Sequence, residues 1–273
     1  MKKGKSFIVL AVTLGFMLAT TAAYAGNLVI NGSTTVLPIA QKVAEAYMKE
    51  HPDVKITLSG GGSGDGIKAI IDGTTDIANA SRDMKDKEIA LAKEKGVMPV
   101  KHTVAYDCII PVVHASNTVK DLTMEQLKGI YKGEIKNWKE VGGPDLQITV
   151  ISRDTSSGTY EVWEEKIMKK ERVFPGALLQ ASSGAIVQAV SKNKNAVGYI
   201  GIGYVTADIK ALSVNGVAGS KTSALDGTFP ISRPLFMFTK GEPEGDAKNF
   251  LIYVKDPQKG QKYVEESGYV PLQ

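Results

Sequence analysis

The sequence predicts an α/β fold, and three observations support this prediction. Short runs rich in β-branched residues alternate with helical patterns through most of the chain. Turns rich in glycine, serine and threonine follow several of these runs. The composition, 43% hydrophobic and 23% charged over 273 residues, is that of an ordinary globular protein. Because strands that alternate with helices pair in parallel through right-handed crossovers, we expect helices layered on parallel sheet.

The first 25 residues are expected to form a signal peptide that is no part of this fold. They begin with the basic segment MKKGKS, continue with an apolar run and end in AAYA, the small-x-small pattern that signal peptidase cleaves. A membrane anchor fits less well because the apolar run is short and stops at the cleavage pattern. We therefore expect cleavage after Ala25 and a mature, soluble protein in the periplasm.

Cleavage also changes the charge of the chain. It removes Lys2, Lys3 and Lys5 from the 33 basic residues, which leaves 30 against 29 acidic residues. The basic character of the full chain is therefore largely that of the signal peptide. The mature chain has no basic block of the kind that nucleic acids or membrane surfaces attract, so we expect no nucleic-acid partner.

The cysteine and the histidines give no sign of redox, metal or nucleophilic chemistry. Cys108 is the only cysteine and lies in an apolar run, which predicts a buried, inert thiol. His51, His102 and His114 lack metal-ligand spacing and lie outside the serine-rich turns. We expect no metal, no cofactor and no catalytic residue.

The elements of the first half follow in order. We expect strands at 27–32, 54–60 and 76–81, and helices at 38–51, 66–73 and 85–96. In the first helix, Ile39, Val43 and Tyr47 stand at helical spacing, and Pro38 suits the first turn. The long apolar stretch at 98–114 is of the kind that leaves one sheet and enters another.

After residue 114 the pattern restarts. We expect helices at 123–133, 160–170 and 185–193, strands at 147–153, 196–203, 209–214 and 231–241, and two helices at 245–256 and 258–267. Two α/β halves of about 100 residues each fit this order better than one, although a single doubly wound domain stays open.

Four turns rich in glycine, serine and threonine join a predicted strand to a predicted helix or open a helix: 32–35, 60–66, 153–159 and 182–185. At such a place the unpaired amides of the first helical turn and the positive end of the helix dipole face outward, so an anion can bind there. Helix capping explains any one turn taken alone. Four of them, one with Arg153, favour a shared anion site at the carboxyl ends of the strands.

Other glycine-rich motifs are excluded because residues that they require are absent from this sequence. A P-loop requires lysine where Ile67 stands, and the dinucleotide fingerprint requires glycine at the same position. The G-x-S-x-G motif of serine hydrolases requires glycine at the position where Asp65 stands. We therefore expect the serines to donate hydrogen bonds and not to act as nucleophiles.

Several motifs, spread over nearly the whole mature chain, resemble the phosphate-binding proteins of phosphate-specific ABC importers in their shorter form: GSTTVLP, GGGSGDGIKA, IANASRDMKDKE, LTMEQLKGIYKGEIKNWKEVGG, SRDTSSGT and NAVGYIGIGYV. The resemblance implies a type II periplasmic-binding-protein fold, with two α/β lobes that crossing hinge strands join. It implies lobe I at 26–112 with a return segment at 225–273, and lobe II at 113–224. It also implies a monomer that captures inorganic phosphate, delivers it to a membrane permease and is not an enzyme.

The resemblance also implies which residues bind phosphate. Those that match the family's ligand positions are Ser33, Thr34, Thr35, Ser63, Arg153, Ser157, Gly158 and Thr159, and Ser81 and Arg82 occupy a position that also faces the cleft. Three residues depart from the pattern. Thr155 stands where relatives often have an acid, Ser156 replaces a glycine, and Arg82 stands where long relatives have aspartate.

These departures leave open which carboxylate accepts the proton of hydrogen phosphate. Such an acceptor would repel fully ionised sulfate and so discriminate between the two anions. The candidates are Asp65, Asp107 and Asp154. Asp107 interrupts an apolar run and must be paired or hydrogen-bonded. The alternatives are a receptor for another oxyanion, such as sulfate or molybdate, and a secreted phosphatase or serine hydrolase.

Overall fold

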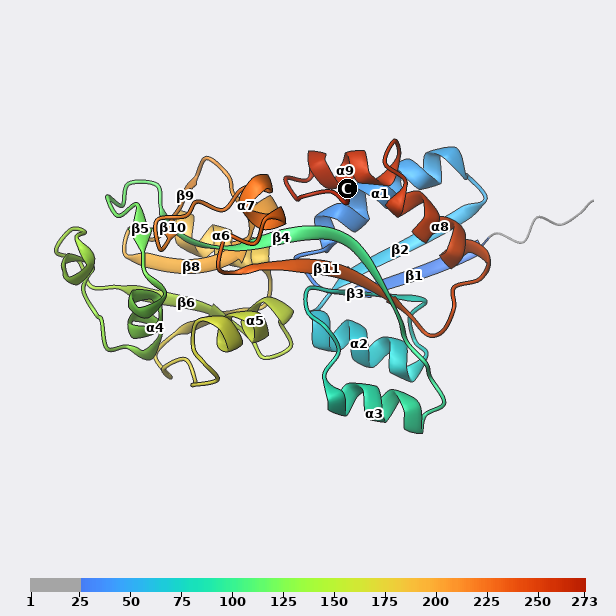
Figure 1. Cartoon of the computed structure of the whole chain (residues 1–273), viewed down its shortest axis with the longest axis horizontal. Helices are drawn as coiled ribbons and strands as arrows, with labels where there is room; N and C mark the ends of the chain where they lie inside the picture. Colours follow the sequence, from blue (N-terminus) through green and yellow to red (C-terminus); the bar gives the residue numbers. More distant parts are fainter. Residues whose placement is uncertain (1–25) are drawn as a thin grey trace, which may run out of the picture.

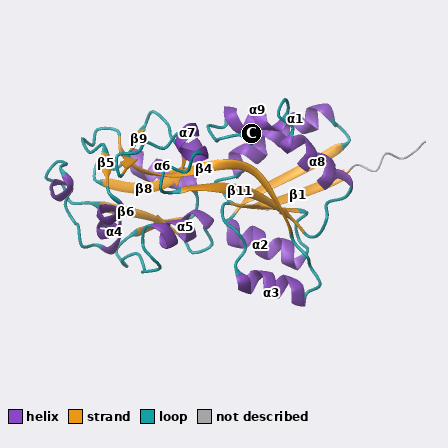
Figure 2. Cartoon of the chain, viewed as in Figure 1, coloured by secondary structure: helices purple, strands orange, loops and turns teal. Residues whose placement is uncertain are grey.

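The computed structural model describes residues 26–273; the predicted signal peptide and its cleavage site lie outside this range. Figure 1 shows an elongated molecule of two lobes, joined where β4 (Val100–His114) and β11 (Ser232–Thr239) run side by side. We use lobe I for the part that contains the N-terminal strands and the C-terminal helices, and lobe II for the other part. Figure 2 shows strands running through both lobes with helices on either side.

Lobe I contains three parallel-paired strands and five helices: β1 (Gly26–Gly32), α1 (Leu37–Glu50), β2 (Val54–Gly60), α2 (Ser63–Asp72), β3 (Ile77–Ala80), α3 (Asp86–Glu94), α8 (Gly245–Lys255) and α9 (Gly260–Glu266). The expected strands and helices of this lobe are all present, with bounds that differ by at most a few residues. The expected end of α2 at Gly73 is also found, because Gly73 has the left-handed conformation (φ 72°) that glycine adopts without strain.

Lobe II contains shorter elements: β5 (Asp121–Leu122), α4 (Met124–Lys132), η1 (Trp138–Val141), β6 (Thr149–Arg153), α5 (Gly158–Lys166), β7 (Leu178–Gln180), α6 (Ser183–Ser191), β8 (Ala196–Gly201), η2 (Ile202–Tyr204), β9 (Ile209–Ala211), β10 (Ser213–Val214) and α7 (Lys221–Leu225). The expected strand at 209–214 is divided, since β9 pairs with β4 and β10 pairs with β5. The expected helix at 160–170 ends earlier, because Lys169 and Lys170 have positive φ angles.

Within residues 26–273 the order of the main sheet is β2-β1-β3-β11-β4-β8-β6-β7, and β9 pairs with β4 in addition. The three strands of lobe I are parallel to one another, as are β8, β6 and β7 of lobe II. The crossing strands β4 and β11 are antiparallel to each other and to their other neighbours. The long apolar stretch therefore does leave one half of the sheet and enter the other.

The two lobes have separate hydrophobic cores. In lobe I, α1, α8 and α9 cover one face of the sheet through residues such as Ile39 and Phe250, and α2 and α3 cover the other through residues such as Ile70. In lobe II, the core includes Trp163 of α5, which stacks on Tyr199 with ring centroids 4.3 Å apart. Each lobe can therefore keep its packing while the angle between the lobes changes.

Among the helices of residues 26–273, none has the length and the apolar character needed to cross a membrane.

Candidate functional site

The first and third glycine-serine turns meet between the lobes. The hydroxyl oxygens of Thr35, between β1 and α1 of lobe I, and Thr159, in α5 of lobe II, are 2.8 Å apart. The Thr34 hydroxyl accepts a hydrogen bond of 3.3 Å from the amide of Ser183, the first residue of α6. The first, third and fourth turns thus lie at one boundary, as the sequence predicts.

The second turn of lobe I packs against the third turn of lobe II even more closely. The Gly64 amide donates to the Ser156 carbonyl at 2.9 Å, and the Ser156 hydroxyl donates to the Gly61 carbonyl at 3.0 Å. A Cβ at Gly158 would lie 2.3 Å from the Ser63 hydroxyl oxygen. Such contacts between the lobes show a closed arrangement.

The starts of helices α2, α5 and α6 all lie at this boundary. Ser157 and Ser182 cap α5 and α6, since their hydroxyls accept from the Tyr160 and Ala185 amides. Helix capping therefore explains why serine hydroxyls are placed at these two positions. It does not explain Ser63, whose hydroxyl accepts from the Ser81 amide at 2.9 Å and lies 3.2 Å from the Ser81 hydroxyl.

Most of the predicted ligands are buried in this arrangement. The residues concerned, all at most 5% exposed, are Ser33, Thr34, Thr35, Ser63, Ser81, Arg153, Ser157 and Thr159. Gly158 is buried with them. Burial of so many hydroxyls is costly unless each finds a hydrogen-bond partner, so their concentration at one boundary indicates a polar binding site.

Arg153 is the buried cation of the third turn. It is 2% exposed and donates to the carbonyls of Gln180 and Ala181 and, at 3.5 Å, to the Ser183 hydroxyl. Burial lowers the pKa of its guanidinium from its ordinary value. Because arginine has five N–H donors and these bonds use three, donors remain for an anion.

Arg82 has a different environment from Arg153. Its two terminal nitrogens donate to the Glu88 carboxylate at 2.7 and 2.8 Å, and its Nε is 2.6 Å from the Glu161 carboxylate. Burial alone would raise the pKa of Glu88, but the hydrogen bonds from Arg82 and the Lys85 amide lower it. Two carboxylates thus compensate the charge of Arg82, and this placement argues against a ligand role for it.

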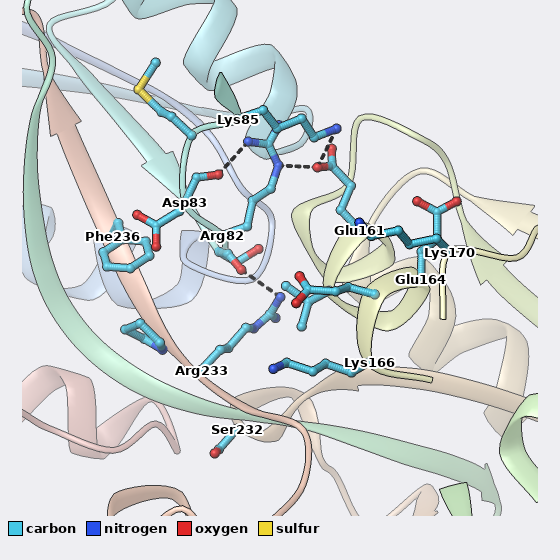
Figure 3. A pocket seen from close by; sticks show the side chains of 15 residues that line it. Arg82, Asp83, Lys85, Glu161, Glu164, Lys166, Lys170, Ser232, Arg233 and Phe236 are labelled. Atoms are coloured by element: carbon cyan, nitrogen blue, oxygen red, sulfur yellow. Dashed lines mark hydrogen bonds and ion pairs between the residues drawn. The ribbon is translucent and has the colours of Figure 1, made fainter. Parts of the chain in front are cut away.

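The contacts of Arg82 form an ionic bridge between the lobes. Glu161, on α5 of lobe II, binds Arg82 and also Lys85 (2.7 Å), both from lobe I. Figure 3 shows the two cations pointing at Glu161. The three side chains line an interlobe groove with a volume of about 720 Å³. We call Glu161, Arg82 and Lys85 the interlobe bridge.

The three candidate proton acceptors differ in environment. Asp65 is exposed on α2. Asp107 is fully buried; burial raises the pKa of its carboxyl, and the Arg233 guanidinium and the Ile202 amide, which hydrogen-bond to it, counteract this rise. Asp154 binds the Ser156 amide and hydroxyl through Oδ1, whereas its buried Oδ2 has no hydrogen-bond partner among the described residues.

Arg233 is a buried residue of this boundary that the sequence analysis missed. It lies on β11, is 6% exposed and pairs with Asp107 at 2.8 Å. The sequence does signal that each residue needs a partner, because Asp107 is the only charge in the apolar run 104–113 and Arg233 is the only charge in the run 229–238. Such charges require a partner, and opposite signs satisfy each other.

Comparison with known proteins identifies the family. A family model for the PBP superfamily domain matches residues 19–257. The phosphate-binding protein PstS of Bacillus subtilis is 32% identical over 291 aligned residues, which cover all of this chain and 95% of the relative. The chain belongs to the family of PstS phosphate-binding proteins. PstS of a Staphylococcus epidermidis strain is 36% identical over 253 residues, which cover 88% of this chain and 77% of that protein.

Solved structures of the family agree with the architecture. A substrate-binding protein from Clostridium perfringens, assigned to a phosphate ABC transporter and containing bound phosphate, matches with a TM-score of 0.84 at 35% identity, over 91% of this chain and all of that chain. An ABC-type phosphate transport receptor from Vibrio cholerae matches with a TM-score of 0.73 at 33% identity, over 90% of this chain and all of that one. The predicted fold, two α/β lobes with crossing strands, is confirmed.

Proposed function

We propose that this chain is an extracytoplasmic receptor that captures inorganic phosphate between its lobes and delivers it to a membrane permease of an ABC importer. The observation that carries the proposal is the meeting of three helix N-termini and their hydroxyls at the closed interlobe boundary. The family's phosphate-binding members support the choice of anion. The chain binds its ligand without chemical change, as expected of a binding protein.

The proposed ligands are the predicted hydroxyls and amides together with Arg153. Helix N-termini hold anions through unpaired amides and the helix dipole, and Arg153 adds one full positive charge. Charge-assisted hydrogen bonds contribute about 1.5–3 kcal/mol each, against the cost of dehydrating the anion. A net of about 8 kcal/mol corresponds to a micromolar dissociation constant, which several such bonds can supply.

We also propose the predicted division into lobe I (26–112 and 225–273) and lobe II (113–224). The pairing of β4 supports a boundary within this strand, since Cys108 is its last residue paired with β11 and Ile109 its first paired with β8. A hinge in the crossing strands would let the lobes part for uptake and release. We propose that the mature receptor begins after Ala25 and works as a monomer in the periplasm.

Titration calorimetry tests the function. Protein stripped of ligand by unfolding and refolding should bind phosphate with a dissociation constant of about a micromolar or below, and should bind sulfate at least a hundredfold more weakly. Tight sulfate or molybdate binding without a response to phosphate would contradict the proposal. Turnover of a chromogenic phosphate ester that disappears in Ser157→Ala would indicate an enzyme instead.

We propose that Asp154 accepts the proton of hydrogen phosphate. Its Oδ2 accepts no hydrogen bond from the described residues and lies at ion-pair distance, 3.6 Å, from Nη2 of Arg153, the proposed cationic ligand. The exposed Asp65 and the already paired Asp107 are less suited to the task.

Asp154→Asn should lower the ratio of phosphate to sulfate affinity at least tenfold. An amide in place of the carboxylate removes the charge that repels sulfate and offers it donors. Parallel calorimetric titrations with both anions measure the ratio. Asp65→Asn is the matched control and should leave the ratio unchanged; an unchanged ratio in Asp154→Asn would exclude Asp154 as the acceptor.

Glu161→Gln should weaken phosphate binding about threefold to tenfold, because it breaks the interlobe bridge that favours the closed state. The loss should come mainly from faster phosphate dissociation, which stopped-flow measurements with a fluorescent label can follow. Glu165→Gln changes an exposed carboxylate on the same helix and should have no such effect. Equal dissociation rates in the two variants would show that the bridge does not contribute to closure.

A further inference from the structure

We propose that Arg233 is a positioning residue for anion capture, which orients the hydroxyl pair of Thr35 and Thr159 so that it offers a hydrogen to the ligand. This inference rests on the proposed phosphate function and adds to it a residue on the crossing strands.

Arg233 is held in place by the opposite crossing strand. It pairs with Asp107 in the antiparallel ladder of β11 and β4. Its Nε and Nη2 donate to one Asp107 oxygen at 3.0 and 2.8 Å, and the other oxygen accepts from the Ile202 amide at 2.9 Å. The guanidinium is thus fixed in direction, and the pair adds no net charge to the site.

From this position Arg233 reaches both lobes. Its Nη1 donates to the Ser81 carbonyl of lobe I at 2.9 Å, and its Nη2 donates to the Thr159 hydroxyl of lobe II at 3.0 Å. Figure 3 shows the Arg233 side chain extending from β11 toward the boundary between the lobes. The Thr159 hydroxyl is in turn 2.8 Å from the Thr35 hydroxyl of lobe I. A chain of polar groups therefore connects the buried ion pair to the first turn.

The chemistry of these polar groups determines which of them donates and which accepts in each hydrogen bond. Arginine donates hydrogen bonds and cannot accept them, so the Thr159 oxygen is an acceptor toward Arg233. The two threonine hydroxyls have two hydrogens, and their mutual bond uses one. Arg233 favours the arrangement in which Thr159 donates to Thr35, which leaves the Thr35 hydrogen free. The unprotonated oxygens of hydrogen phosphate can only accept hydrogen bonds, so they bind best where such hydrogens are already oriented.

A double-mutant cycle on phosphate affinity tests the role. Asp107→Asn combined with Arg233→Gln keeps a hydrogen-bonding but uncharged pair, and glutamine ends two bonds short of the Arg233 nitrogen that contacts Thr159. We expect this pair of substitutions to weaken phosphate binding about tenfold, and Thr159→Val to do the same. Combined, they should weaken it little more than either alone, because Arg233 acts through Thr159.

Thr34→Val is the matched control, since the Thr34 hydroxyl bonds to Ser183 and not to Arg233. Its effect should add to that of the Asp107 and Arg233 substitutions. Additive effects with Thr159→Val, near a hundredfold in total, would overturn the inference and leave Arg233 a structural residue. Should the uncharged pair fail to fold by circular dichroism, Arg233→Lys with Asp107 retained must show the same non-additivity. Absence of phosphate binding by the unmodified protein would instead refute the proposed function.

Discussion

Arg153→Met is expected to reduce phosphate affinity by at least a hundredfold. Arg153 is the buried cation of the third turn, and its loss removes both a full charge and a planar set of donors. A hundredfold loss corresponds to about 2.7 kcal/mol, the scale of one or two charge-assisted hydrogen bonds. Titration calorimetry measures it directly. Arg153→Lys should give an intermediate loss, because the charge remains while the fork of donors is lost.

Arg172→Met serves as the control for Arg153, since Arg172 is an exposed arginine of the same lobe. Its affinity for phosphate should remain within twofold of the unmodified protein. A loss below threefold in Arg153→Met, with the fold intact, would mean that the hydroxyls and helix termini hold the anion without this cation.

Gly158→Ala is expected to abolish tight phosphate binding while leaving the free energy of unfolding nearly unchanged. The added Cβ would lie 2.3 Å from the Ser63 hydroxyl oxygen and 2.8 Å from that of Ser81, both in the opposite lobe. The methyl group therefore obstructs closure but has room once the lobes part. Small-angle X-ray scattering should show no compaction when phosphate is added.

Gly241→Ala is the matched control, because a Cβ at Gly241 has no neighbour within 4 Å. It should bind phosphate and compact normally. Normal compaction of Gly158→Ala would show that the contact between the Ser63 and Gly158 turns is not needed for closure.

The general architecture could be predicted from the sequence because it depends on local signals. The period of apolar residues in α1, the left-handed glycine that ends α2 and the β-branched runs of β1, β2 and β8 each act over a few residues. Several short elements, such as β5, η1 and α7, were not predicted. Strand β7 has three residues, and Leu178 and Leu179 are exposed, so it has neither the length nor the alternation that marks a strand.

The turns of the site were also predictable, since serine, threonine and glycine between a strand and a helix predict an outward-facing helix terminus. Which charged groups pair with one another could not be predicted. Arg233 and Asp107 are 126 residues apart in the sequence, and Glu161 lies in a different lobe from Arg82. Only the crossing of β4 and β11 and the closure of the lobes bring these groups together, and neither can be derived from residue spacing.

A crystal structure of the refolded protein with phosphate would test most directly whether the four turns form one anion site. We predict a single phosphate whose oxygens lie within hydrogen-bond distance of the Ser63 hydroxyl, the α5 amides and the Arg153 guanidinium. Phosphate bound elsewhere, for example between Lys166 and Lys170 in the interlobe groove, with the four turns unoccupied, would contradict it.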